Sequence, residues 1–268
     1  MRIFPIVVVY RADFRQTNAH SSLLSGFQGG SYLIYDNSPE PQNQRNTTPG
    51  TIYYYHDASN GGVSAAYNYG ACLAESIGGV DALLLLDHDT CFQKDYITKL
   101  EEVLEAFPKV DLFVPQVVYQ GDRPFSPVNR GRGRRQGVSL PAGCYSLNDF
   151  LPVNSGACIR LSAFKRVGGY NSAIRLDFAD FDFFSRLAAV TDKFCVLDSV
   201  ARQSFSNEEA CTDKLWQRYQ FYLEGAKIAH RNPLIRRMVE VDALRHACAL
   251  AWRTRNLKFL TGLFRIVR

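Results

Sequence analysis

The 268-residue sequence predicts an α/β fold with a mostly parallel central sheet flanked by helices and a helical C-terminal extension. Short apolar runs alternate with longer segments of helical period, which is typical of strand–helix units around a parallel sheet. Apolar residues make up 46% of the chain and charged residues 21%, proportions that argue against a disordered chain or a coiled coil. The length is sufficient for a large buried core.

Apolar runs in the first 118 residues are predicted to form strands. The first run follows the N-terminus, and no small-residue cleavage site comes after it, so we expect a strand and not a signal peptide. Four consecutive leucines at 83–86 predict a strand that is buried on both faces. The predicted strands are 3–10, 32–35, 51–55, 82–86 and 112–118.

The segments between these strands have helical features. After Asp95, apolar residues recur at three- and four-residue steps from Ile97 to Phe107, which predicts a helix with one face on a sheet. Gly61 and Gly62 precede a helix predicted over 63–74, and such a helix N-terminus attracts phosphate. Further on, we predict a returning strand over 153–159 and a short helix over 162–167.

The chain divides into a main domain and an extension. We predict a domain over 1–212, with halves 1–118 and 119–212, and consecutive helices over 213–268. The segment from Gly121 to Gly137 interrupts the strand and helix pattern with five arginines among Gly, Pro and Ser, which predicts a mobile basic loop. The loop is either a solvated charged segment or a lid that closes over a diphosphate through Arg132 and Arg134, and we favour the lid.

The net charge of +5 is unevenly distributed. Residues 231–268 carry +7 and residues 1–230 carry −2, whereas a nucleic-acid-binding protein more often carries basic charge on its folded body. Apolar residues from Trp252 to Val267 alternate with basic ones, so the tail either docks on the domain or lies on an anionic membrane surface, the second being favoured. No apolar run approaches the length of a spanning helix.

The seven cysteines are odd in number and irregular in spacing, and they contain no C-x-x-C motif. This pattern fits neither a disulfide framework nor a zinc site. We therefore expect reduced thiols and a cytoplasmic location.

The strongest chemical signal is Asp87-His88-Asp89, directly after the run of leucines. Open α/β sheets bind their ligands at the carboxyl ends of strands. Paired carboxylates at that edge suit Mg²⁺ or Mn²⁺, which also accept oxygens from a diphosphate. The alternative is that the two acids only cap the next helix.

A second cluster of acids, Asp177, Asp180 and Asp182, is interleaved with phenylalanines. Exposed aromatics at this density would form an apolar patch, so we expect the carboxylates to be partly buried. Burial raises the pKa of a carboxyl group toward values useful for a general base. Asp182 and Arg186 have the spacing of an ion pair on one helix, which is the simpler interpretation of Asp182.

Four segments in one order, Val7 to Tyr10, Tyr35 to Ser38, Asn60 to Asn68 and Leu86 to Asp89, resemble the family 2 glycosyltransferases of the GT-A fold. The resemblance extends to about residue 206. It implies an inverting transferase that moves a sugar from a nucleoside diphosphate to an acceptor hydroxyl. The spacing of the second acidic cluster is similar to that of bacterial rhamnosyltransferases and galactofuranosyltransferases of surface polysaccharide synthesis.

The resemblance also implies roles for individual residues. Asp180 would be the general base, with Asp177 and Asp182 as second choices, and Asp36 would accept the imide N–H of uracil or thymine. Asp89 would bind the metal directly, and Asp87 would face both the metal and the ribose. The remaining residues expected at the nucleotide or substrate site are Tyr10, Arg11, Asn37, Asn60, Gly61, Asn68, His88, Asn154, Ser155 and Gly156.

The expected partners are a UDP- or dTDP-linked sugar and a glycan or lipid-linked oligosaccharide acceptor, without nucleic acid. The expected location is the cytoplasmic face of the inner membrane, contacted through the basic C-terminal helices. One departure from the family is Gln203, which stands where many relatives have a metal-binding His, and an amide is the weaker ligand for Mn²⁺.

Gln203 therefore leaves open a binding module that keeps the nucleotide site without turnover. A sugar nucleotidyltransferase is disfavoured because the segment from Tyr10 to Phe14 lacks the glycines of that class. A nucleic-acid binder would depend on the basic loop and the tail alone.

Overall fold

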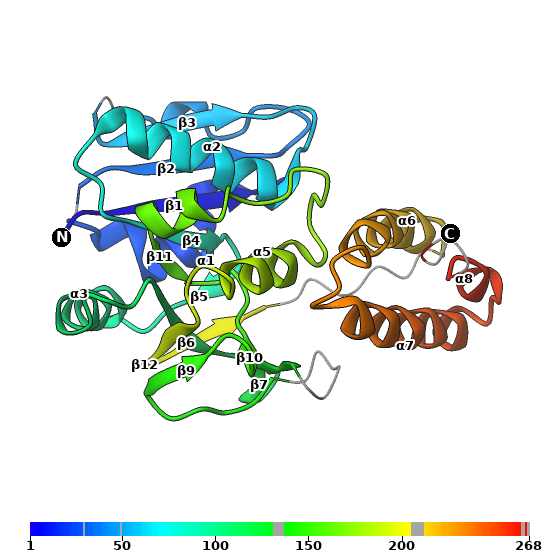
Figure 1. Cartoon of the computed structure of the whole chain (residues 1–268). Coiled ribbons are helices and arrows are strands. Elements are labelled where there is room, and N and C mark those ends of the chain that lie inside the picture. The colour runs from blue at the N-terminus through cyan, green and yellow to red at the C-terminus, as the bar shows by residue number, and fades with distance from the viewer. Residues whose placement is uncertain (29, 49, 131–136, 205–211, 264–265, 267–268) are drawn as a thin grey trace.

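The computed structural model describes residues 1–28, 30–48, 50–130, 137–204, 212–263 and 266 (Figure 1). Within them, a ten-stranded mixed sheet has the main order β3-β2-β1-β4-β11-β6-β12-β5, with β7 beside β6 and β9 beside β12. The predicted α/β architecture is confirmed. Helices pack against the sheet, and a separate group of C-terminal helices lies to one side (Figure 1).

The parallel half of the sheet contains four of the predicted strands. β1 (Ile3–Val9) pairs with β2 (Tyr32–Asp36) on one side and with β4 (Ala82–Asp87) on the other, and β3 (Ile52–His56) forms the outer edge. Residues 83–86 are fully buried, as a run of leucines between two layers requires. These strands end at one edge of the sheet, where Asp36 and Asp87 are the last residues of β2 and β4.

The other half of the sheet is mixed. β6 (Leu112–Tyr119) runs parallel to the long β12 (Lys193–Gln203), and β11 (Cys158–Arg160) is antiparallel to both β4 and β6. The strand predicted over 153–159 is wrong in extent, because only its last two residues belong to β11. Residues 154–156 form a turn, in which Gly156 has a φ of +83° and a Cβ would lie 2.7 Å from the Phe92 ring.

Short elements complete the main domain. β5 (Thr90–Cys91) and β9 (Gly143–Ser146) pair with β12, and β7 (Arg123–Ser126) pairs with β6. The remaining small elements are η1 (Phe14–Gln16), α1 (Asn18–Ser22), η2 (Leu24–Gly26), η3 (Gln44–Asn46), β8 (Val128–Asn129) and β10 (Phe150–Leu151).

Four longer helices pack around the sheet. α2 (Gly62–Ile77) and α3 (Tyr96–Ala106) confirm the two helices predicted between strands, and α4 (Leu161–Arg166) confirms the short one. On α3, Leu100 and Leu104 are fully buried, as the three- and four-residue period requires. α5 (Ala179–Leu187) contains the second acidic cluster and begins after Phe178, whose φ is +69°.

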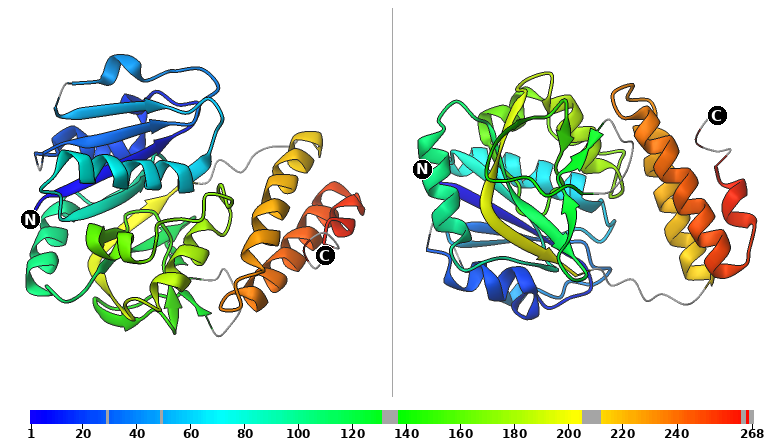
Figure 2. Two further views of the ribbon diagram at one scale, coloured as in Figure 1. Left: turned by 45° about the horizontal axis from the view of Figure 1, so that its top comes forward. Right: turned by 90° about the horizontal axis from the view of Figure 1, so that it is seen from below.

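The predicted run of C-terminal helices is confirmed by α6 (Thr212–Ala229), α7 (Arg236–Thr254) and α8 (Lys258–Thr261). They lie beside α5, beyond the edge at which β1 ends (Figures 1 and 2). The rings of Phe178 and Tyr222 are 5.1 Å apart, and Arg218 on α6 forms an ion pair with Asp177 at 2.5 Å. The helices therefore dock on the α5 side of the main domain.

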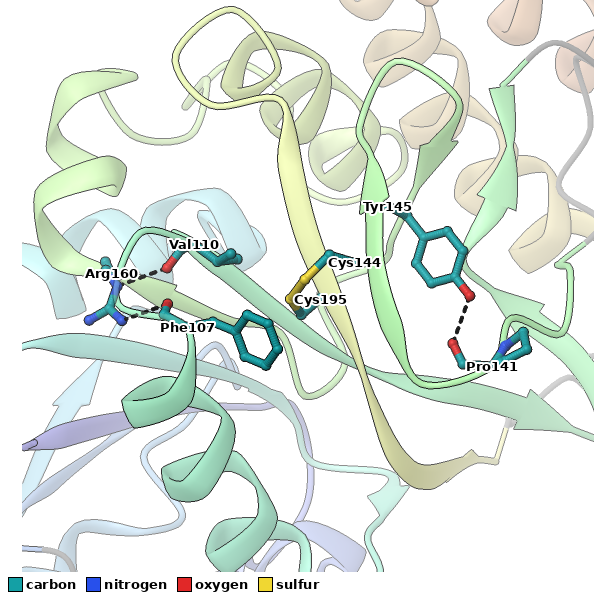
Figure 3. The surroundings of a disulfide bond; sticks show 7 residues. All are labelled: Phe107, Val110, Pro141, Cys144, Tyr145, Arg160 and Cys195. Carbon is teal, nitrogen blue, oxygen red and sulfur yellow. Dashed lines mark hydrogen bonds between the residues drawn. A yellow bond between two sulfur atoms is a disulfide. The ribbon is translucent and has the colours of Figure 1, made fainter.

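The cysteine prediction is wrong for two of the seven thiols. Cys144 on β9 and Cys195 on β12 face each other in an antiparallel pair and form a disulfide (Figure 3). The spacing of 51 residues has no local motif, so only the strand pairing brings the two sulfurs together. Cys72, Cys91, Cys158 and Cys248 are free.

Candidate active site

The carboxyl edge of the parallel strands brings the first acidic motif next to the Asn-Ser-Gly turn. Asp87 ends β4, and Ser155, which is buried, donates a hydrogen bond of 2.6 Å from its Oγ to Asp87 Oδ2. The Tyr67 hydroxyl lies 3.5 Å from the other carboxylate oxygen. Burial raises the pKa of Asp87, and the hydrogen bond from Ser155 opposes this effect.

Asp89, in the turn after β4, has unused binding capacity. Its Oδ1 is buried and has no hydrogen-bond partner in the structure. Burial and the nearby charge of Asp87 raise the pKa of Asp89 to about 6, while a hydrogen bond from the Gln203 side chain opposes the shift. A buried carboxylate oxygen without a donor is costly unless a ligand binds it.

Gln203 lies close to both carboxylates of the motif. It pairs with Thr90 across β12 and β5, and its Oε1 lies 3.3 Å from the Ser155 hydroxyl that also contacts Asp87. The resemblance to the family led us to expect Gln203 where many relatives have a metal-binding His, and in the structure its side chain lies next to Asp89. Gln203 thus lies between the two aspartates, next to Asp89 and linked to Asp87 through the Ser155 hydroxyl.

The donor set fits a divalent cation that takes further oxygens from a diphosphate. Two carboxylates, one of which has an orphan buried oxygen, are the hard ligands that Mg²⁺ and Mn²⁺ prefer. Within the described ranges, no cluster of three or more His, Cys, Asp or Glu residues could hold a metal without such help. His88 is turned away, with its Nδ1 at 3.2 Å from the Val8 carbonyl oxygen.

The second acidic cluster approaches the same site through two buried tyrosines. Asp180 lies in the first turn of α5 and accepts a 2.8 Å hydrogen bond from the backbone N–H of Phe181. Tyr67 and Tyr170 are fully buried, with ring centroids 5.3 Å apart. Burial first, and then the charges of both Asp87 and Asp180, raise the pKa of each tyrosine hydroxyl. The charges of the two aspartates therefore act on one tyrosine pair.

The predicted burial around Asp180 agrees with the structure. Phe178, Phe181 and Phe184 are 1%, 3% and 0% exposed and pack into the core, while Asp180 is half-buried. The Asn-Ser-Gly turn supports the tyrosine pair, because the Tyr170 hydroxyl donates to Asn154 Oδ1 at 2.5 Å. The carbonyl oxygen of Gly156 accepts a hydrogen bond from the Tyr96 hydroxyl.

Asp36, the predicted base-binding acid, is closed off. Its side chain is 0% exposed, and its two carboxylate oxygens accept hydrogen bonds from the Ser38 and Gln42 backbone N–H groups, the Asn43 amide and the Tyr54 hydroxyl. Burial alone would raise the pKa of Asp36, but these donors together lower it. The structure gives no support to a contact between Asp36 and a pyrimidine base.

The neighbouring Asn37 differs from Asp36. It is 3% exposed, and its Oδ1 is buried without a hydrogen-bond partner. Tyr10 and Arg11 follow β1 at the same edge and are exposed; the Arg11 guanidinium lies 5.2 Å from the Tyr10 ring centroid. The Arg11 backbone N–H donates to Ser38 Oγ at 2.7 Å, which connects this segment to the end of β2.

The Asn60–Asn68 segment has a mainly structural role. Asp57, which the sequence analysis missed, accepts hydrogen bonds from Gly61 N–H at 2.8 Å and from the Tyr35 hydroxyl at 2.9 Å. Asn68 bonds the backbone N–H and carbonyl of Tyr170 and the Ser172 hydroxyl. The Asn68 amide holds the turn before α5, and its predicted place in a nucleotide pocket stays a prediction. Asn60 is exposed, with a φ of +52°.

The entrance to α2 is also occupied. The Val63 N–H donates to the Arg175 carbonyl oxygen at 2.9 Å, and Ser64 Oγ donates to the Ile174 carbonyl oxygen. A Cβ on Gly62 would lie 2.0 Å from the Arg175 oxygen, and the Gly62 φ is +77°. These backbone groups hold the segment before α5 in place of the predicted phosphate.

The two second-choice acids form ion pairs. Asp182 is 4% exposed and pairs with Arg186 at 2.9 Å, as the four-residue spacing predicts, although the pair is largely buried and not at the surface. Asn232, after α6, donates to Asp182 Oδ1 at 3.1 Å. Asp177 pairs with Arg218. Both acids therefore connect α5 to its surroundings.

The basic loop is only partly a loop. Residues 123–126 and 128–129 form β7 and β8, and Arg130 donates to the backbone oxygens of Leu147 and Leu234. Arg130 thus holds neighbouring segments together and does not serve a lid. Arg132 and Arg134 lie outside the described residues, and the proposed lid role for them stays a prediction.

Sequence analysis missed the tyrosines that connect the two acidic clusters. Tyr67 directly precedes Asn68, inside a segment that was selected for other residues, and Tyr170 lies in the Gly168–Asn171 segment between α4 and the second acidic cluster. α2 also contains Tyr69, so the presence of a tyrosine in this helix does not by itself identify Tyr67. The contact between Ser155 and Asp87 spans 68 residues and has no local signal.

The fold and the paired acids at the strand ends define the class of GT-A glycosyltransferases, and solved structures agree. A GalNAc-T7 structure with UDP, GalNAc and Mn²⁺ matches with a TM-score of 0.61 and 11% identity, over 86% of this chain and 48% of that chain. TarS from S. aureus matches with a TM-score of 0.55 and 13% identity, over 91% of this chain and 40% of that one. Residues 1–349 of TarS, in complex with UDP, match with a TM-score of 0.54 and 14% identity, over 97% and 71%.

The model of glycosyl transferase family group 2 matches residues 82–266, more than half of the chain. The chain therefore belongs to this family. No curated protein sequence matches it. The chain spans about half or less of the first two of these structures. At 11–14% sequence identity, the three structures establish a shared fold alone.

Proposed function

We propose that the chain is an inverting glycosyltransferase in which Asp180 is the general base. The observation that supports the proposal is that Asp87 and Asp180, which are 93 residues apart in the sequence, both influence the hydroxyls of one buried tyrosine pair, in which the Tyr67 hydroxyl lies 3.5 Å from Asp87. A donor held at Asp87 and Asp89 would therefore lie close to Asp180. Asp180 takes the proton of an acceptor hydroxyl as that oxygen attacks the anomeric carbon, and the nucleoside diphosphate leaves.

The metal site of the proposal consists of Asp89 and Asp87. Mg²⁺ or Mn²⁺ bound there would neutralise charge on the leaving diphosphate. Ser155 and Gln203 hold the two carboxylates in fixed orientations, so the site is organised before a donor binds. The GalNAc-T7 structure, which contains UDP and Mn²⁺, supports a divalent cation in this fold.

For the nucleotide, we propose contacts from Tyr10, Arg11 and Asn37, with Asn60 and Gly61 at the rim. The orphan Oδ1 of Asn37 can accept the imide N–H that uracil and thymine share, in place of the closed Asp36. His88, Asn154, Ser155 and Gly156 would lie beneath the donor sugar. The proposed donors are UDP- or dTDP-linked rhamnose or galactofuranose.

We further propose an acceptor glycan carried on a lipid, in bacterial surface polysaccharide synthesis, with residues 1–212 as the catalytic domain and 213–268 as the helical extension. The contacts of α6 with Asp177 and Phe178 support separate roles for the two parts, because these residues directly precede the helix that carries the proposed base. A cytoplasmic enzyme at the inner membrane would meet both a soluble donor and a lipid-linked acceptor.

A binding module without turnover is the second candidate, favoured by Gln203 in place of a metal-binding His. One experiment separates the two. The full-length protein is incubated with a panel of UDP- and dTDP-sugars with and without Mn²⁺, and donor-stabilised melting and nucleoside diphosphate release are measured. An enzyme gives both donor-stabilised melting and nucleoside diphosphate release. A binding module gives the stabilisation without release for every donor and acceptor tested. The absence of both signals contradicts both candidates.

A further inference from the structure

The outer face of α7 carries large apolar side chains that the core does not use. We define it by Arg237, Leu244, Arg245 and Trp252, which helical geometry places on one side of α7, together with Leu257 just after the helix. Leu244 is 53% exposed, Trp252 is 88% exposed and Leu257 is 72% exposed. Solitary exposed leucines are common, but an exposed tryptophan beside them marks a contact surface.

The opposite side of α7 accounts for its packing within the extension. Val239, Ala243 and Ala247 are fully buried, and Leu250 is 7% exposed. The Tyr222 hydroxyl on α6 donates to Asp242 at 2.8 Å, on the same side of the helix pair. The outer face is therefore not needed to hold α7 on α6.

The charge of the outer face is complementary to an anionic surface. Arg237, Arg245 and Arg255 are exposed on or next to it. The acid nearest to this side, Glu240, is hydrogen-bonded by His230 Nε2 at 2.7 Å. Arginine with tryptophan and leucine is the composition of a helix that lies in a bilayer interface. No helix in the described ranges is long and apolar enough to cross a membrane.

We propose that the outer face of α7 binds anionic phospholipid, with the helix parallel to the membrane plane and Trp252 at the level of the headgroups. The helix group lies beside α5 (Figure 1), so binding would hold the proposed base close to lipid-attached acceptors. That orientation depends on the proposed function, but the lipid contact itself does not.

The test uses the full chain with Trp216→Phe, which leaves Trp252 as the sole tryptophan because the sequence has two. The probes are vesicles of phosphatidylcholine alone and vesicles that also contain phosphatidylglycerol. We expect co-sedimentation and a blue shift of Trp252 emission only with the anionic vesicles. In a Trp216-containing chain, Arg237→Glu with Arg245→Glu should weaken binding at least about tenfold, and Trp252→Ser with Leu257→Ser should reduce it similarly.

Matched controls separate this face from general charge and general hydrophobicity. Lys94→Glu with Lys109→Glu makes the same change in charge on exposed residues of another region, and Phe107→Ser removes a side chain that is 44% exposed. Both should bind vesicles as the unmodified chain does. The proposal is overturned if the outer-face variants bind normally, if the controls lose binding equally, or if the face instead forms a dimer that Leu244→Ser abolishes in light scattering.

Transfer to a soluble acceptor distinguishes this proposal from the function proposed above. We expect the outer-face variants to keep that activity while they lose vesicle binding. If the chain binds vesicles but transfers no sugar, the lipid contact is supported and the proposed enzymatic function is contradicted. If it transfers sugar but does not bind vesicles, the enzymatic function is supported and the lipid contact is contradicted. Unchanged circular dichroism confirms that each variant is folded.

Discussion

Two carboxylates at the carboxyl edge of the parallel strands have opposite environments. Asp36, at the end of β2, is saturated by four protein donors, which lower its pKa. Asp89, just after β4, keeps a buried oxygen without a donor and has its pKa raised to about 6 by burial and then by Asp87. A motif identifies both acids, but only the hydrogen bonds reveal which of them can still bind a ligand. Asp36 is hydrogen-bonded within the fold, and the free oxygen of Asp89 is the one that we propose for a cation.

The same contrast occurs within α5. Asp182 is locked by Arg186 and Asn232, whereas Asp180, two residues before it, lies beside the tyrosine pair near Asp87. Because the two side chains differ in role and not in type, equal substitutions at both positions should have different consequences.

The largest expected effect comes from Asp180→Asn compared with Asp182→Asn. Removal of a general base slows transfer by about 10² to 10⁴-fold, so Asp180→Asn should abolish measurable transfer and leave the melting temperature and donor binding nearly unchanged. Asp182→Asn should instead lower stability, because it leaves Arg186 without its buried partner. Steady-state rates and thermal melts measure both. Equal loss of donor binding and transfer in Asp180→Asn would make Asp180 a structural residue.

The next effect sharpens the comparison between β2 and β4. Asp36→Asn should destabilise the apo protein by about 3 kcal/mol, because the new amide N–H groups would face the donors whose hydrogen bonds the Asp36 carboxylate accepts. Asp89→Asn should stabilise it by about 1–3 kcal/mol at neutral pH, since a raised pKa means that ionisation of Asp89 opposes folding. Urea unfolding in chelator measures both. Destabilisation of the apo protein by both substitutions would remove the contrast.

A smaller effect is expected from pH. A metal ion requires the ionised form of Asp89, whose pKa is raised to about 6. Mn²⁺ affinity should therefore be nearly constant above pH 7 and fall as the pH decreases through 6. The stability of the metal-free protein changes in the opposite direction. Because the folded protein favours protonated Asp89, the stabilisation that this proton provides is lost as the pH rises through 6. Titrations at several pH values test this, and a midpoint near 4 would contradict the burial of Asp89.

The smallest effect should come from Gln203. Gln203→Ala removes one hydrogen bond to Asp89 and should weaken Mn²⁺ binding by a few-fold, about 1 kcal/mol. Gln203→His supplies an imidazole and should strengthen it. Isothermal titration compares the two with Ser199→Ala, whose hydroxyl contacts Gln93 away from the carboxylates, as the control. If Gln203→Ala binds as well as the unmodified chain, Gln203 does not orient Asp89.

Much of the fold was predictable because its signals are local. The run of leucines at 83–86 and the apolar period of α3 depend on neighbours in the sequence, and both elements form where they were predicted. The strand predicted over 153–159 failed because the turn-forming residues Asn154, Ser155 and Gly156 interrupt it. The disulfide between Cys144 and Cys195 depends on strand pairing, which no spacing of cysteines shows.

The residue types of the candidate site could be predicted from the sequence, but the hydrogen bonds between its side chains could not. The motifs identified Asp87, Asp89 and Asp180, and the prediction of their roles remains to be tested. The sequence could not show that Asn43 and Tyr54 close Asp36, or that Asn68 bonds the Tyr170 backbone, because these contacts join segments that are distant in the chain. Whether a polar side chain is saturated depends on tertiary contacts, so motif matching overestimates the number of ligand-binding residues.

Direct measurement of Mn²⁺ binding tests the central claim that Asp89 and not Asp36 retains binding capacity. Electron paramagnetic resonance of free Mn²⁺, with UDP present, is recorded for the full-length chain, Asp89→Asn and Asp36→Asn at a temperature where all three are folded. We predict that Asp89→Asn abolishes Mn²⁺ binding, whereas Asp36→Asn binds the ion as the unmodified chain does. Normal binding by Asp89→Asn, or its loss in folded Asp36→Asn, would contradict the account.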